Sequence, residues 1–291
     1  MTTPELIAQA RRDAAARIAL TDTSIRILIG VEEQNLARQI FDEVWPTAEG
    51  TQITANLLQA LVHNGTYVSG VFIGEEIVGA AFAFPSVDEQ RHLHLHSHMA
   101  AVKEGYRNRN IGSALKWHQR AWALGHGYEV ITWTFDPLVR RNAKLNLAKL
   151  GVQVFDYFPD FYGDLPDLLN AGDPTDRVIA RWELLSRRVI DAATNENLEL
   201  SPGTIPVALE NAEGYPLRHD LSPNYSRVLC YLPDDIITLR ASQNSAALDW
   251  RLALRAELAP RLDSGWAISG FTSDGAFIVS KKDPLTENLV P

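Results

Sequence analysis

The sequence predicts an α/β fold, in detail an α+β arrangement, in which a mixed central sheet is flanked by helices and followed by a smaller C-terminal α+β extension. Short apolar runs of strand length alternate with segments whose apolar residues recur at helical spacing. Two of the helical segments lie between strands, which indicates a sheet covered by helices rather than a helical bundle. The 291 residues suffice for one large or two modest units with a buried core.

The first half of the chain supplies most of the regular elements. Residues 4–20 have apolar side chains at helical spacing and predict an amphipathic helix outside the main domain. The next elements are a strand at 25–30, helices at 32–45 and 53–65, strands at 66–74 and 75–84, a strand at 92–102, a helix at 111–124, a strand at 129–135, a helix at 139–150 and a strand at 152–158. Pro85 is expected to close the hairpin of the second and third strands.

The second half has weaker signals. Residues 163–176 are rich in turn residues, and a strand is expected at 176–186. Residues 191–225 are interpreted as loop because prolines and glycines interrupt them throughout. A strand at 226–233, a helix at 245–262 and strands at 265–273 and 275–282 complete the chain. We therefore predict an N-terminal helix over 1–24, a main domain over 25–190 and an extension over 191–291.

Composition and charge exclude several classes of protein. Hydrophobic residues make up 46% and charged residues 22%, an ordinary globular composition. The 36 acidic against 27 basic residues give a net charge of -9, which disfavours nucleic acid or an anionic membrane as the main partner. The only cysteine, Cys230, excludes an internal disulfide and a thiolate zinc site. Charges interrupt the N-terminal apolar pattern, so we expect neither a signal peptide nor a membrane span, and a soluble cytoplasmic protein.

The most informative segment, MAAVKEGYRNRNIGSALKW, is a strand that runs into a polar loop and then a helix. A helix N-terminus presents unpaired amide groups and the positive end of the helix dipole, so this loop can cradle a pyrophosphate. Gly112 removes a side chain where a phosphate would approach, and Arg107 and Arg109 add positive charge.

RNRNIGSAL resembles the acyl-CoA loop of the GNAT (GCN5-related N-acetyltransferase) superfamily, whose pattern is Arg or Gln, two residues, Gly, one residue, Gly or Ala. Arg107 takes the first position and Gly112 the last, while Asn110 replaces the first glycine and tolerates a left-handed backbone. The resemblance implies acyl-CoA contacts at Ala101, Val102, Arg107, Asn108, Arg109, Asn110, Ile111, Gly112 and Ser113. In the family, the strand that carries Val102 pairs through its backbone with the pantetheine arm.

The resemblance extends over residues 25–165 in the order of elements, so the domain at 25–190 is expected to have the GNAT fold. The segment RRNAKLNLAKLG is similar to the family's asparagine-bearing helix, with Asn142 or Asn146 at the asparagine position. Together with YFPDFYG and GDPTDRVIARWELLS, it resembles a branch with a C-terminal extension that is associated with N-succinylation of amino acids.

Four histidines, at positions 92, 94, 96 and 98, alternate along one predicted strand and should share one face, with Ser97 and Met99 opposite. A metal site would need further ligands, and no such motif lies nearby, so no metal is predicted. HSHMAAV resembles the HLHALAV strand of arylalkylamine N-acetyltransferases. That resemblance implies that His96 and His98 relay the amine proton, the alternative being that they pack as ordinary histidines.

The remaining candidates lie further along the chain. The family's usual acid, a tyrosine, falls on Leu147 here, so Tyr157 or Tyr162 could replace it, with Tyr157 as the selected candidate, or the thiolate leaves unaided. Asp136, after a strand, is either a substrate contact or a helix cap. Arg177 is the selected candidate for binding a substrate carboxylate, from a set that also includes Arg140, Arg141 and Arg181. Solvated surface pairing is the alternative for each of these arginines.

These features predict a CoA-dependent N-acyltransferase that transfers an acetyl or succinyl group from acyl-CoA to the amine of a small molecule, with an amino acid as the leading acceptor. Acyl-CoA is the co-substrate, and no metal, nucleic acid or membrane is expected. Homodimerisation stays open. The alternatives are a catalytically inactive GNAT-like acyl-CoA-binding or sensor protein and, on the histidine strand, a metal hydrolase.

Overall fold

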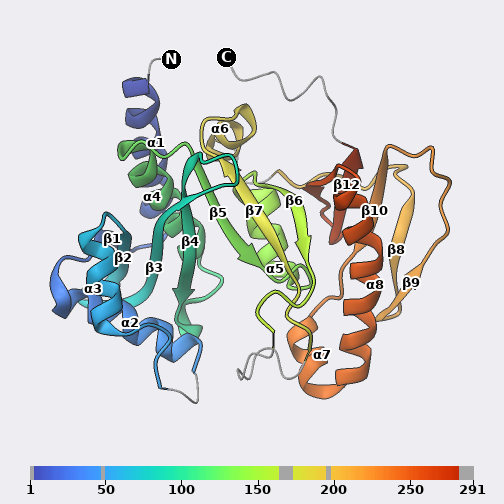
Figure 1. Cartoon of the computed structure of the whole chain (residues 1–291), viewed down its shortest axis with the longest axis horizontal. Coiled ribbons are helices and arrows are strands. Elements are labelled where there is room, and N and C mark those ends of the chain that lie inside the picture. The colour runs from blue at the N-terminus through green and yellow to red at the C-terminus, as the bar shows by residue number, and fades with distance from the viewer. Residues whose placement is uncertain (1–2, 47–49, 164–172, 195–197, 282–291) are drawn as a thin grey trace. The chain divides into compact units, whose positions relative to one another are not determined.

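The computed structural model describes residues 3–46, 50–163, 173–194 and 198–281 (Figure 1). The chain divides into two compact units: unit 1 comprises residues 1–133 and 183–185, and unit 2 comprises residues 134–182 and 186–291. The chain first passes from unit 1 to unit 2 within strand β5 (Val130–Phe135). This division differs from the domain bounds expected from the sequence, which remain a prediction.

Unit 1 contains five neighbouring strands in the order β1-β2-β3-β4-β5. Their bounds are β1 Ser24–Ile27, β2 Tyr67–Ile73, β3 Glu76–Val87, β4 Leu93–Val102 and, across the boundary, β5. The first four strands pair antiparallel, whereas β4 and β5 pair parallel at Leu95 with Ile131 and at His96 with Thr132. The predicted mixed sheet is thus confirmed.

Strand β3 is longer than predicted because Pro85 does not end it. Pro85 is paired with Leu95 of β4, while the ladder between β2 and β3 ends at Ala83. Proline lacks the amide donor, which is tolerated where a strand needs hydrogen bonds on one side only. The sequence signal for a strand end was therefore wrong by three residues.

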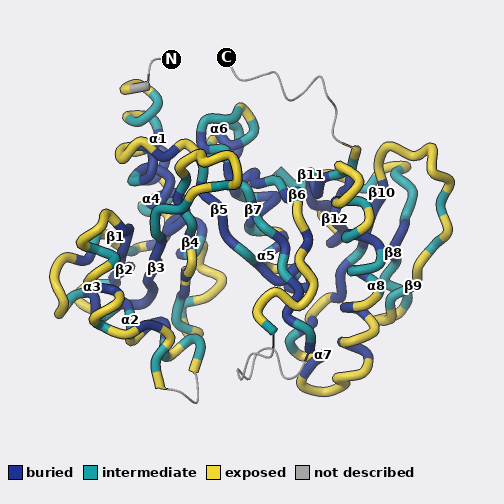
Figure 2. The backbone as a smooth tube through the Cα atoms, viewed as in Figure 1, coloured by how far each residue is buried: buried dark blue, intermediate teal, exposed yellow. Residues whose placement is uncertain are grey.

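Helices cover the strands of unit 1 (Figures 1 and 2). Their bounds are α1 Thr3–Ala19, α2 Gly30–Val44, α3 Ala55–His63 and α4 Ile111–Gly125, with a 3₁₀ turn, η1, at Glu104–Tyr106. Residues of α2 and α3 form one apolar cluster with β2, β3 and β4, including Phe41, Leu58, Phe82 and Met99. Burial of these side chains is the main source of stability for this part of the unit.

Helix α1, expected to lie outside the main domain, packs against α4 within unit 1. Asp13 of α1 accepts a hydrogen bond from Arg120 of α4 at 3.1 Å, and both side chains are buried. Arg120 also donates to the carbonyl oxygen of Leu184 at 2.9 Å. The N-terminal helix is therefore fixed to the helix that follows the candidate acyl-CoA loop.

Unit 2 contains seven neighbouring strands in the order β7-β6-β11-β12-β10-β8-β9. Their bounds are β6 Gln153–Phe158, β7 Arg177–Glu183, β8 Val207–Ala212, β9 Tyr215–Arg218, β10 Arg227–Tyr231, β11 Trp266–Phe271 and β12 Ala276–Lys281. The C-terminal strands join β6 through β11, where Ile268 pairs with Val154. The strands of the predicted extension thus share a compact unit with β6 and with most of β7.

Unit 2 departs from the predicted elements in three places, two of which concern helices and one a stretch predicted as loop. The bounds of its helices are α5 Arg140–Ala143, the π-helix η2 Lys144–Lys149, α6 Arg187–Thr194, α7 Ile236–Ser242 and α8 Asn244–Asp263. The helix expected at 139–150 is a short α-helix that continues as π-helix. The region 191–225, expected to be loop, contains the end of α6 and strands β8 and β9, and α7 was not expected. The turn-rich stretch 163–176 lies mostly outside the described residues.

Two further observations concern expectations from composition. Cys230 is fully buried on β10, and burial raises the pKa of its thiol to about 12. Across the described part of the chain, no helix combines the length and apolar character needed to cross a bilayer.

Candidate functional site

Strand β4 of unit 1 carries the predicted histidines and contains a bulge. Met99 is paired with Phe82 and Ser97 with Ala83, so His98 is an extra residue that opposes neither. The bulge places His98 and Met99 on the same side: His98 contacts Phe82 and Phe84, and Met99 joins the apolar cluster with Phe82. The expectation that Met99 lies opposite the histidines was wrong, because strict alternation ends at a bulge.

His92, expected on the strand, lies outside it. His92 precedes β4 in the turn, and its amide donates to Asp88 at 2.8 Å. His96 and His98 have ring centroids 6.3 Å apart. Hence the structure brings His96 and His98 together against Phe84, and places His92 in the turn instead of on the strand.

His96 is half-buried and anchored to the neighbouring strand. Its Nδ1 lies 3.1 Å from the hydroxyl of Thr132 on β5, which leaves Nε2 for proton transfer. Burial, together with the charges of His98, His94 and Lys116, lowers the pKa of His96 to about 4. Burial among neighbouring atoms also lowers the pKa of His98, although its side chain keeps exposed surface. Both imidazoles are therefore neutral at pH 7, the form that accepts a proton.

The predicted acyl-CoA loop follows β4 directly. Ala101 and Val102 end the strand, η1 follows, and α4 begins at Ile111. Asn108 and Asn110 have φ of 64° and 57°, the left-handed conformation that the asparagine at position 110 was expected to tolerate. The first helical hydrogen bond runs from Ala114 to Asn110 at 3.0 Å, so the amides of residues 111–113 precede it.

The loop fits a diphosphate in two respects. A Cβ built on Gly112 meets no atom within 4 Å, so the space beside this amide is open. Arg107 and Arg109 are exposed, with Arg107 donating to the carbonyl oxygen of Val102 at 3.3 Å and Arg109 lying over the Tyr106 ring. Open amides, positive charge and the start of a 15-residue helix form an anion-binding arrangement.

Asp136 of unit 2 is enclosed by buried arginines. Arg251 donates to both of its oxygens, at 2.9 and 3.0 Å, and Arg240 donates at 2.6 Å. The amide of Leu138 donates to it at 2.9 Å. Burial alone would raise its pKa, but Arg251 and Arg240 hold the pKa of Asp136 well below its usual range. These contacts favour a structural role for Asp136 in an ion-pair network, but not the predicted helix cap, because Val139 occupies the N-cap position of α5.

The two candidate tyrosines of unit 2 have different surroundings. The Tyr157 hydroxyl is buried and donates a hydrogen bond to Asp176, which also accepts a hydrogen bond from Arg255. Burial and the Asp176 carboxylate raise the pKa of Tyr157 above its usual value. Tyr162 is more exposed, and its hydroxyl lies 2.9 Å from that of Thr134 on β5. Tyr162 is therefore better placed than Tyr157 to release a proton to a ligand.

Arg177 begins β7 and is half-buried in unit 2. It donates to the carbonyl oxygen of Asp176 at 2.9 Å, and its guanidinium lies 5.3 Å from the centre of the Tyr162 ring. Burial lowers the pKa of Arg177, which Asp136 partly offsets. Arg177 and Tyr162 thus form one cationic, aromatic corner of unit 2.

The two candidate asparagines lie on the interrupted helix. Asn142 is half-buried in α5, and Asn146 is buried in the π-helix η2. The carbonyl oxygen of Asn146 accepts the amide of Val152 at 3.0 Å, and Leu150 donates to Leu145, the longer spacing of a π turn. Such turns are frequent at functional sites, but no contact here distinguishes Asn142 from Asn146 as the coenzyme ligand.

Sequence reasoning missed two residues that surround the histidines. Neither Thr132, the partner of His96, nor Lys116 of α4 was singled out from the sequence. Lys116 follows Ala114 and Leu115 in an amphipathic helix, so the only sequence signal for its burial is its position relative to the apolar face of that helix. Both assignments depend on which residues of separate elements meet.

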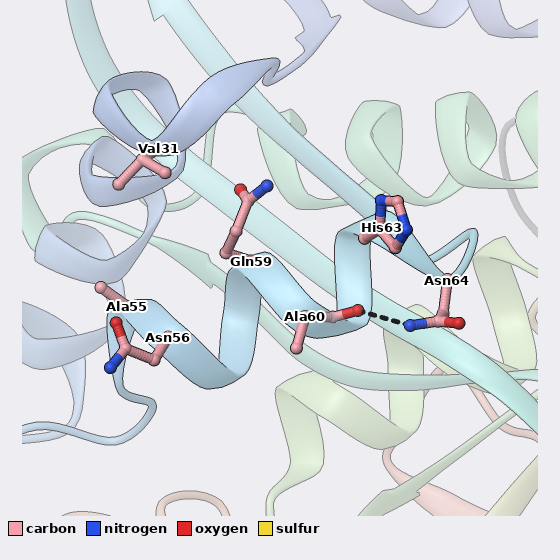
Figure 3. A pocket seen from close by; sticks show the side chains of 7 residues that line it. All are labelled: Val31, Ala55, Asn56, Gln59, Ala60, His63 and Asn64. Carbon is pink, nitrogen blue, oxygen red and sulfur yellow. Dashed lines mark hydrogen bonds between the residues drawn. The ribbon is translucent and has the colours of Figure 1, made fainter.

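The described residues contain no group of three or more His, Cys, Asp or Glu side chains that could hold a metal ion. A surface hollow of about 520 Å³ lies between α2 and α3 of unit 1 (Figure 3). Its lining comprises Val31, Ala55, Asn56, Gln59, Ala60, His63 and Asn64. None of the predicted site residues is among them.

A protein-family model matches the part of the chain that contains β4, the loop after it and α4. Residues 32–151 match the model of the acetyltransferase (GNAT) family. This match confirms the fold class predicted for that part of the chain and supports the predicted enzyme class, an acyl-CoA-dependent N-acyltransferase. No relative was found among curated protein sequences.

Solved structures resemble about half of the chain. A GNAT acetyltransferase of Streptococcus pneumoniae is 14% identical, with 55% of this chain and 98% of that chain aligned and a TM-score of 0.45. A GNAT acetyltransferase of Elizabethkingia anophelis with acetyl-CoA bound is 17% identical, with 56% of this chain and 98% of that chain aligned and a TM-score of 0.42. The ribosomal-protein-S18-alanine N-acetyltransferase of Escherichia coli is 14% identical, with 56% of this chain and 94% of that chain aligned and a TM-score of 0.42.

Proposed function

We propose that the protein transfers an acetyl or succinyl group from acyl-CoA to the amine of a small molecule, with an amino acid as the leading candidate acceptor. The observation that carries this proposal is the loop before α4, with its two left-handed asparagines and the open space at Gly112. Bound acyl-CoA would supply a thioester as the electrophile. The residues proposed to hold it are those predicted from the loop pattern, 101–102 and 107–113, with Asn142 or Asn146.

His96 is proposed as the base that removes the amine proton, and His98 as its relay. The Thr132 hydroxyl fixes the ring of His96 through Nδ1, and the proposed tautomer has Nδ1–H donate to this hydroxyl, so that Nε2 carries the lone pair that accepts the proton. A base with a pKa of about 4 is unprotonated throughout the neutral range. We expect the acid limb of the kcat/KM profile to lie below the usual histidine value of about 6.5.

Tyr162 is proposed as the acid that protonates the departing thiolate, in preference to Tyr157. Its hydroxyl meets another hydroxyl, that of Thr134, whereas the Tyr157 proton is held by a buried carboxylate. Arg177, on the face of the Tyr162 ring, is proposed to bind the carboxylate of an amino acid or of a succinyl group, since a guanidinium binds a carboxylate through two parallel hydrogen bonds.

The test combines binding with turnover. Calorimetric titration with acetyl-CoA and with succinyl-CoA should show binding, and Gly112→Leu should weaken it about tenfold or more by filling the open space beside the amide. Release of free thiol is then measured with each donor and a panel of amino acids. His96→Gln should lower thiol release by about 10²-fold or more without changing coenzyme affinity.

Two results would contradict the proposal. Absence of binding to either donor would remove its basis in the loop. Binding without thiol release for any acceptor amine would instead favour the inactive acyl-CoA-binding alternative. As a specificity control, Arg177→Met should raise KM for carboxylate-bearing acceptors and leave KM for neutral amines unchanged.

A further inference from the structure

Lys116, on α4 of unit 1, is a buried lysine without a carboxylate partner. Its side chain is 6% exposed, although lysine is rarely buried unless it is paired. Its ammonium donates to the hydroxyl of Ser97 at 2.7 Å and to the side-chain oxygen of Gln119 at 3.2 Å. It also lies 3.8 Å from the centre of the Trp133 ring. Among the described residues, no acidic side chain forms an ion pair with it.

This burial opposes the charge. Burial lowers the pKa of Lys116 to about 7, so the group loses its proton far more readily than a lysine in water. An unbranched apolar side chain of similar length would occupy the same space without that penalty, and such replacements of buried charges are often neutral or stabilising. The ammonium therefore has to be explained by something other than stability.

The position of Lys116 supplies the explanation. The parallel ladder of β4 and β5 ends at the pair His96 and Thr132. Lys116 contacts the next residue on each strand, Ser97 on β4 and Trp133 on β5. It therefore joins the two strands immediately beyond the pair whose side chains hydrogen-bond to each other.

We propose that Lys116 is a positioning residue for the histidine pair: from the face of the sheet opposite to His96, its ammonium joins Ser97 to Trp133, fixes the bulge at His98, and adds a positive charge behind the strand that carries His96. Ser97 is the last regularly paired residue before the bulge, so holding it fixes the backbone from which His98 projects. The inference rests on the proposed acyltransferase function for its catalytic consequence, but its structural part does not require a substrate.

Few charged groups influence His96, from either face of the sheet. His94 and His98 lie on its own strand, Lys116 lies on α4, and the Thr132 and Phe84 side chains from β5 and β3 are uncharged. Burial is the main cause of the lowered pKa of His96, and because like charges disfavour a second positive charge nearby, Lys116 adds to this effect. Arg120, one turn further on α4, is instead paired with Asp13.

The experiment measures the titration of His96 by NMR in the full-length protein, without coenzyme or acceptor. Lys116→Met keeps the length of the side chain and removes the ammonium. We expect the His96 midpoint to rise towards its usual value and the His98 resonance to broaden or shift as the bulge loosens. His96→Gln identifies the resonance. Lys281→Met is the matched control, because Lys281 is also a lysine over a tryptophan, Trp266, but is exposed.

Turnover gives the second measurement. In Lys116→Met we expect kcat to fall about tenfold or more, with KM for acyl-CoA unchanged, because small displacements of a base are costly. The double variant Ser97→Ala with Lys116→Met removes the orphaned hydroxyl, so it should fold as well as the wild type while kcat stays low. Unchanged His96 and His98 resonances in Lys116→Met would overturn the proposal even if no acyltransferase activity were found. A shifted His96 midpoint in a protein without turnover would contradict the proposed function only.

Discussion

Lys116 in unit 1 and Arg251 in unit 2 are both almost completely buried, yet only the arginine faces carboxylates. Arg251 pairs with Asp136 and Asp173, which Arg240 also contacts. Lys116 has a hydroxyl, an amide oxygen and an aromatic face in place of an anion. Both regions therefore bury a cation, but only unit 2 pairs that cation with carboxylates.

The difference indicates what each cation is for. In unit 2 the charges compensate each other, and the network joins the end of β5 to α7 and α8, so its role is structural. In unit 1 the charge of Lys116 has no carboxylate partner among the described residues and lies across the sheet from the proposed base. An uncompensated charge is costly for stability but acts on neighbouring titratable groups, which is typical of functional sites.

The largest effect is expected when a compensated charge is broken. Arg251→Met should lower the free energy of unfolding by about 3–5 kcal/mol, because it leaves Asp136 and Asp173 with Arg240 alone among these buried partners. Urea denaturation measures the change. Arg187→Met, at an exposed arginine, should alter stability by less than about 0.5 kcal/mol. A loss below about 1 kcal/mol in Arg251→Met would mean that the network is not structural.

A second variant tests whether breaking a compensated charge also lowers stability in unit 1. Asp13→Asn removes the partner of buried Arg120 in unit 1 and should cost about 1–3 kcal/mol. The cost is smaller than for Arg251 because Arg120 keeps the carbonyl oxygen of Leu184. Thermal unfolding at pH 7 is the measurement, and an increase in stability would contradict the expectation.

The uncompensated charge should give a characteristic pH dependence. The pKa of Lys116 is about 7 in the folded protein and about 10.4 in an unfolded chain, so the unfolded state binds more protons between these values. Stability should therefore rise from pH 7 towards pH 10, with a slope of at most about 1.4 kcal/mol per pH unit from this group. Lys116→Met should reduce this slope, whereas Arg251→Met should not.

The smallest effect concerns the buried hydroxyl next to the compensated network. Tyr157→Phe removes the hydrogen bond to Asp176, which keeps Arg255, and should cost about 1 kcal/mol. If Tyr162 is the acid, kcat should be unchanged in Tyr157→Phe and reduced in Tyr162→Phe. The reverse pattern of rates would restore Tyr157 as the acid that the sequence suggested.

The elements around the candidate loop could be predicted from the sequence because their signals are local. The strand before Val102, the polar loop and the helix from Ile111 follow from hydrophobic periodicity and loop chemistry. The left-handed backbone at Asn110 was also foreseeable, since asparagine adopts that conformation more readily than most residues. These features require only neighbours in the sequence.

Other features escaped because they depend on pairing between distant segments. Strands β8 and β9 lie in a stretch with many prolines and glycines, and the pairing of β8 with β10 and of β9 with β8 stabilises them in spite of that composition. The bulge at His98 is defined only by the register against β3. Asp136 could be read as a ligand contact or a cap, and the two arginines of α7 and α8 that enclose it lie more than 100 residues away.

By itself, the sequence predicted the order of the central elements, an anion-binding loop and His96 and His98 as candidate bases, because these predictions rest on short-range spacing and side-chain chemistry. Only the tertiary structure decided which charges are compensated, since a side chain's environment is made by residues that the fold brings together. That is why Arg251 and Lys116, equally cationic in the sequence, are expected to serve stability and chemistry respectively.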